Sequence, residues 1–121
     1  MDVSDNREEF KIEFTNLLTD IIQPAMNKLM DDFNAWGYKA ENIEPCDSCL
    51  SGKCYKVYTK NAQSHIKITV NPDEEEFKTL ISTECSSCDR TIKNDALYKS
   101  DEITSMLLEK IVIDCFSKIV Q

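Results

Sequence analysis

The sequence is poor in glycine, proline and histidine. Its 121 residues include two glycines, three prolines and one histidine. Two glycines cannot form the glycine-rich turns that bind phosphates, which excludes P-loop and dinucleotide-binding enzymes. The single histidine, His65, has no evident partner for acid–base chemistry, and no nucleophile-and-base set can be assigned. We therefore expect a protein without catalytic residues.

Long hydrophobic runs are also missing. The longest uninterrupted aliphatic run covers residues 111–113, whereas a membrane helix needs about 20 apolar residues. The amino terminus is acidic and polar, unlike a secretory leader. These features predict a soluble, cytoplasmic protein without a membrane anchor, and in that compartment its six cysteines should be thiols.

Negative charge predominates. The chain has 14 lysines and arginines against 22 acidic residues, a net charge of -8, and 41% hydrophobic residues. The acidic balance repels polyanions, so we do not expect nucleic-acid binding. The length and hydrophobic content suit one domain covering residues 1–121.

Helical periodicity is present at both ends of the chain. Asp5 and Glu8 have the spacing of a capping box, which predicts a helix over residues 5–36 that is kinked or divided near Pro24. Ser100 is the expected cap of a second helix that runs almost to the carboxyl end. The expected apolar stripe of that helix is Ile103, Leu107, Ile111, Cys115 and Ile119, widened by Leu108, Val112 and Phe116.

Between the helices the pattern alternates. It predicts strands over residues 38–43, 54–60, 65–70 and 77–83, with reversals at 61–64 and 71–74. Phe77 and Ile81 are expected to face inward on the last strand. The predicted fold class is α+β: a two-layer sandwich with a long kinked amino-terminal helix and a carboxy-terminal helix on one face of an antiparallel meander of 3–4 strands.

The cysteines form two C-x-x-C pairs, Cys46 with Cys49 and Cys85 with Cys88. Zinc takes four thiolate or imidazole ligands, so the two pairs predict a structural zinc site with four cysteine ligands. In this respect the chain resembles zinc-ribbon and treble-clef sites, although the 35 residues between the pairs exceed the usual spacing. Three intervening strands would also leave the two pairs at opposite ends of the sheet.

Three other interpretations of the cysteines stay open. The pairs can be ordinary reduced cysteines in loops, with Cys115 in the core. A metal can instead be bound by Cys46, Cys49 and Cys54 with His65. A redox pair is the third interpretation, but neither pair lies at a helix amino terminus, where a thiolate is favoured.

Lysines gather on the predicted outer face of the sheet. Lys56, Lys60, Lys67 and Lys78 surround Tyr58 in an otherwise acidic chain. Lysines that discourage edge association would give this pattern, as would a surface for an acidic peptide or single-stranded nucleic acid. As a candidate partner-binding set we take Lys56, Tyr58, Lys67 and Lys78. The edge of the first predicted strand is the other surface expected to be free.

The sequence therefore predicts a small acidic protein-binding module, a monomer or homodimer, that carries a structural zinc. The first alternative is an enzyme that uses the C-x-x-C thiols or a metal. A second is a secretion chaperone, which the small acidic α/β composition resembles loosely.

Overall fold

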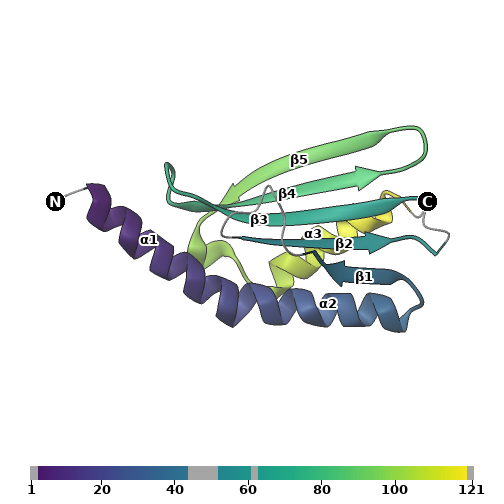
Figure 1. The fold of residues 1–121 in the computed structure, drawn as a ribbon, viewed down its shortest axis with the longest axis horizontal. Helices are drawn as coiled ribbons and strands as arrows, with labels where there is room; N and C mark the ends of the chain where they lie inside the picture. The colour runs from purple at the N-terminus through teal and green to yellow at the C-terminus, as the bar shows by residue number, and fades with distance from the viewer. Residues whose placement is uncertain (1–2, 44–51, 61–62, 120–121) are drawn as a thin grey trace.

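The computed structural model describes residues 3–43, 52–60 and 63–119, with side chains from residue 6 onward. The chain opens with a long helical segment that bends in the middle (Figure 1). It consists of α1 (Val3–Leu17), a π-helical turn (Leu18–Ile22) and α2 (Gln23–Ala35). Pro24 occupies the first turn of α2, and the Gln23 N–H donates to the Leu18 carbonyl, five residues back. The predicted division near Pro24 is confirmed, because a proline interrupts the regular α-helical hydrogen-bond pattern.

The predicted start of this helix is wrong. Helix α1 already includes Val3, so Asp5 lies within the helix and is not its cap. At the other end Gly37, with a φ of 94°, follows α2 in the left-handed region. That conformation costs glycine little, so it ends the helix as the sequence predicts.

Five antiparallel strands form one open sheet in sequential order, not the 3–4 strands predicted. They are β1 (Lys39–Asn42), β2 (Lys53–Tyr58), β3 (His65–Asp73), β4 (Lys78–Ser86) and β5 (Thr91–Tyr98). The α+β class is confirmed. The sequence pattern does not predict β5, because its sequence, TIKNDALY, lacks a hydrophobic alternation and most of its side chains are exposed.

The predicted reversal at residues 71–74 is also wrong. Strand β3 continues through Pro72, which is paired with Thr79 of β4. Strand β2 starts at Lys53, opposite Val70, so Pro72 lies beyond the end of β2 and has β4 as its only strand neighbour in the described sheet. The turn comes later, and Phe77 lies in it with a φ of 54° rather than facing inward on a strand.

The carboxy-terminal helix begins later than predicted. Ser100–Glu102 is a short 3-10 turn, and α3 covers Ser105–Ser117. Its cap is Thr104, whose Oγ1 accepts from the Leu107 N–H at 3.1 Å. Ser100 is therefore not the cap of this helix. The buried face of α3 consists of Leu108, Val112, Cys115 and Phe116. Of these, only Cys115 belongs to the predicted apolar stripe, and the other three were expected to widen it.

The helices lie against one face of the sheet, and the hydrophobic core fills the space between them (Figure 1). Tyr55 and Val57 of β2 and Ile66, Ile68 and Val70 of β3 are fully or almost fully buried against the helices. The opposite face of the sheet carries no described helix. No described helix is long and apolar enough to cross a membrane.

The edge of β1 is closed by a side chain. Asn34 of α2 donates from Nδ2 to the Ala40 carbonyl and accepts the Ala40 N–H at Oδ1, each at 3.0 Å. The amide thus takes the place of a neighbouring strand. The expectation of a free surface here is wrong at Ala40, because both of its backbone groups are already bonded.

Replacing Asn34 by alanine should lower the free energy of unfolding by about 1–3 kcal/mol, because two part-buried backbone groups lose their partners. Asn34→Asp keeps the acceptor and should lose about half as much. Urea unfolding of both variants tests this expectation. An alanine variant as stable as the wild type would show that water replaces the amide without cost.

Candidate functional site

The sheet face away from the helices, called the exposed sheet face below, is the candidate site, and its side chains range from buried (Cys54, Thr69) to exposed. Strand alternation and register place Lys56 and Tyr58 of β2 on it, directly opposite Lys67 and His65 of β3. Lys39 of β1 lies opposite Tyr58 on the other side. These five residues, Lys39, Lys56, Tyr58, His65 and Lys67, are called the lysine patch below.

Two cations lie over one aromatic ring in the lysine patch. The ammonium groups of Lys56 and Lys39 are 5.0 Å and 5.5 Å from the centroid of Tyr58. The His65 ring lies beside the same tyrosine, with 5.8 Å between the centroids. Cation–π attraction holds the lysines over the ring without neutralising their charge.

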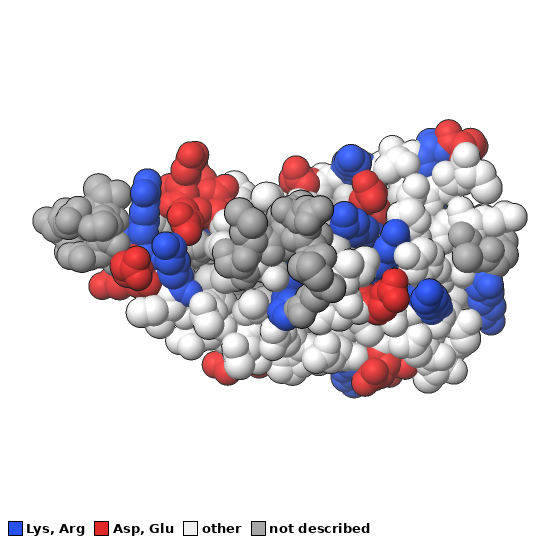
Figure 2. All heavy atoms as spheres, in the orientation of Figure 1, with Lys and Arg blue, Asp and Glu red and all other residues white. Residues whose placement is uncertain are grey.

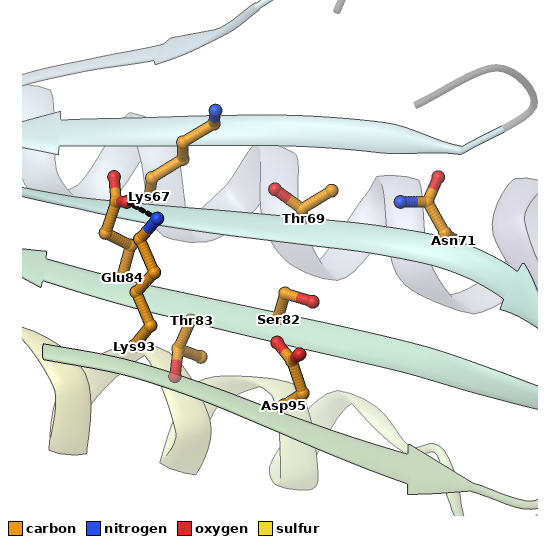
Figure 3. A pocket seen from close by; sticks show the side chains of 8 residues that line it. All are labelled: Lys67, Thr69, Asn71, Ser82, Thr83, Glu84, Lys93 and Asp95. Carbon is orange, nitrogen blue, oxygen red and sulfur yellow. Dashed lines mark ion pairs between the residues drawn. The ribbon is translucent and has the colours of Figure 1, made fainter. Parts of the chain in front are cut away.

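Each central lysine of the patch has a carboxylate opposite it on the neighbouring strand but none within 4 Å in the described chain, and the first of these carboxylates is Glu41 of β1, opposite Lys56. Glu84 of β4 lies opposite Lys67, but its oxygens contact Lys93 at 3.5 Å and His65 at 3.9 Å. Figure 3 shows the Lys67 side chain reaching toward β2, away from Glu84. Lys56 and Lys67 are paired across β2 and β3. Neither ammonium group has a carboxylate oxygen within 4 Å among the described residues.

The positive charge of the patch affects its histidine. Desolvation, and then Lys56, lower the pKa of His65 below 6.5, Lys67 adds to the lowering, and Glu84 opposes it. The folded protein thus binds this proton less readily than the unfolded chain. Protonation of His65 therefore lowers the free energy of unfolding as the pH falls from about 6.5 through the pKa of the folded protein. Above that range His65 has no such effect.

A shallow polar depression of about 220 Å³ adjoins the lysine patch (Figure 3). Hydroxyl groups of Thr69 and Ser82 lie between Lys67 at one end and Asn71 at the other. Glu84, Lys93, Asp95 and Thr83 complete the lining. Hydroxyls and amides both donate and accept hydrogen bonds, so this depression can accommodate polar groups of a peptide backbone.

Charge is unevenly spread over this side of the molecule. In Figure 2 lysines and arginines gather over the half of the sheet away from the amino terminus, with acidic residues among them. The largest acidic group lies toward the amino-terminal end. The face is therefore locally less negative than the net charge of -8 implies.

Of the four predicted partner-binding residues, the structure brings Lys56, Tyr58 and Lys67 together. Lys78 faces the same side but pairs with Asp73, six residues along β3 from Lys67, or about 20 Å. The prediction omitted Lys39 and His65. Both could have been found by extending the strand alternation to the first predicted strand and to the start of the third.

The predicted zinc ligands are described only in part. Cys46 and Cys49 lie outside the described residues. Cys85 is buried, with its sulfur 2.7 Å from that of Cys115 on α3, while Cys88 is exposed and approaches Gln63 at 4.0 Å. The shared zinc site stays a prediction.

Metal-binding groups are not seen elsewhere in the described part of the chain. Residues 3–43, 52–60 and 63–119 hold no cluster of three potential ligands. Cys54 pairs with Thr69 and His65 with Tyr58, so these two potential ligands are four residues apart along β3. That is about 13 Å, too far for both side chains to reach one zinc ion.

Comparisons with known proteins give no functional lead. No family model matches the chain, and neither the search of curated proteins nor the search of solved structures returns a significant match. The functional argument for this chain therefore rests on the geometry and charge of its exposed sheet face.

Proposed function

We propose that this protein is a non-catalytic binding module whose lysine patch binds an acidic segment of a partner protein. The observation that carries the proposal is the pairing of Lys56 with Lys67 across β2 and β3. Glu41 and Glu84 lie opposite them on the neighbouring strands, but no described carboxylate oxygen comes within 4 Å of either ammonium group. Like charges directly opposite each other destabilise a sheet. A carboxylate ligand between them removes that repulsion.

An acidic peptide fits this surface better than a nucleic acid. A sheet that binds single strands offers an open aromatic face on which bases stack. Here Lys39 and Lys56 lie over the ring of Tyr58. The net charge of -8 also repels a long polyanion, whereas a short acidic segment meets mainly the local field of the patch.

The chain's single histidine provides a reporter for this binding. In an NMR pH titration the imidazole of His65 should show a pKa below 6.5 in the free protein. Adding a capped hexaglutamate peptide should raise that pKa, because its carboxylates offset the fields of Lys56 and Lys67. An unchanged titration curve at saturating peptide contradicts the proposal.

A charge-reversal pair locates the site. Lys56→Glu combined with Lys67→Glu should weaken peptide binding by about tenfold or more. Because both side chains are half-buried and face Glu41 and Glu84, circular dichroism of the variant checks that it is folded. The matched control is Lys78→Glu, at the far end of the same face, which should bind as the wild type does. Equal loss in both proteins would indicate attraction by overall charge and no defined site.

A further inference from the structure

The two edges of the sheet differ. The edge of β1 is closed by Asn34, as described above. Strand β5 is the other edge, eight residues long, and on its outer side it pairs with no described strand. Figure 1 shows no described element on the side of β5 that faces away from β4. Such an edge presents a row of backbone groups that can pair with another strand.

The charges on β5 are placed so that two antiparallel copies of this strand can pair opposite charges. Lys93 and Asp95 lie on the exposed sheet face, on either side of Asn94. Lys93 contacts Glu84 at 3.5 Å and is largely exposed. Asp95 has no cation within 4 Å among the described residues.

We infer that β5 pairs antiparallel with β5 of a second copy of this chain, about a two-fold axis through Asn94. In that register Lys93 lies opposite Asp95 of the second copy, and Asp95 opposite its Lys93. The two sheets join into one continuous sheet with both lysine patches on the same side. A two-fold contact of this kind uses the same surface on both copies.

The same charges exclude the neighbouring registers. Moving the pairing by two residues in one direction places Lys93 opposite Lys93, and in the other direction Asp95 opposite Asp95. Like charges directly across a strand pair are destabilising, so both alternatives are disfavoured. The order of the two charges thus favours the register centred on Asn94 over these two neighbours, and all three keep both helix layers on one side.

The other side of β5 supports the same pairing. Ile92 and Ala96 face the helix layer, because they pair with Cys85 and Ile81. Ile92 is nevertheless 38% exposed. In the proposed register each Ile92 lies opposite an Ala96 and loses part of that exposure, which favours association.

Complementary charge reversals test the interface. Sedimentation of the full chain is measured up to about 1 mM protein, the range of weak association. The mass should reach twice the 13.9 kDa of one chain. Lys93→Asp alone and Asp95→Lys alone should each raise the dissociation constant about tenfold or more, because each places like charges together. An equimolar mixture of the two variants should associate again, since every cross-strand pair then joins opposite charges.

Two results would overturn this inference. A wild-type chain that stays monomeric throughout the series has no such contact. Single variants that associate as the wild type does, or a mixture that fails to recover while each variant keeps its circular dichroism spectrum, exclude β5 as the interface. The measurement contains no peptide, so it is independent of the proposed lysine-patch ligand.

Discussion

Phe33→Ala should lower the free energy of unfolding by about 3–5 kcal/mol. Phe33 is 1% exposed and belongs to an aromatic cluster that connects α2 with α3 and with the segment entering β1. Its ring centroid lies 4.8 Å from that of Phe116, 5.6 Å from Trp36 and 6.1 Å from Tyr38. Alanine leaves a cavity between two helices that have little freedom to close it.

The matched control for this variant is Ile12→Ala on α1. Ile12 is 62% exposed, so its loss should change the free energy of unfolding by no more than about 0.5 kcal/mol. Chemical denaturation with one fluorescence probe and one circular dichroism probe measures both variants. A Phe33 variant that loses no more than the Ile12 variant would mean that the aromatic cluster is not packed as described.

The sequence predicted elements whose burial follows a simple period. Phe10, Phe14 and Leu17 on α1 and Ile66, Ile68 and Val70 on β3 repeat at helical and strand spacing, and all are buried. Strand β5 has no such pattern, because no helix layer fully covers it: Asn94 faces the helix side and is exposed. Its pairing with β4 depends on backbone hydrogen bonds, which leave little signature in the side chains.

The composition of the lysine patch could be predicted, but not its extent. Alternation alone identifies Lys56, Tyr58 and Lys67 as one face, and equally adds Lys78. The distance of Lys78 depends on where the β3–β4 turn falls, and the sequence Asn-Pro-Asp at residues 71–73 suggested a turn that the structure places later. The closure of β1 by Asn34 and the contact of Cys85 with Cys115 join residues of separate elements, so local patterns do not reveal them.

Oxidation should join Cys85 of β4 to Cys115 of α3. The two thiols are 5% and 3% exposed, and their sulfurs are 2.7 Å apart. Hydrogen peroxide takes up the two thiol hydrogens, the disulfide bond forms and two waters leave. Cys115 lines a groove of about 180 Å³ between α3 and the β4–β5 part of the sheet, which gives a small oxidant a route to the pair. Burial and the neighbouring Cys85 raise the pKa of Cys115, so the reaction should be slow at neutral pH and faster in alkali.

The resulting disulfide should raise the free energy of unfolding by about 3–4 kcal/mol, because it closes a long loop in the unfolded chain. A chain with Cys46, Cys49 and Cys88 replaced by serine and the buried Cys54 by alanine isolates the pair Cys85 and Cys115. Adding Cys115→Ser gives the control that should gain nothing. Peptide mapping identifies the linked cysteines, and urea unfolding with and without reductant measures the gain. If the isolated pair forms no disulfide and the free energy of unfolding does not rise, the two sulfurs are not in contact. Strand β4 and helix α3 must then pack differently at that point.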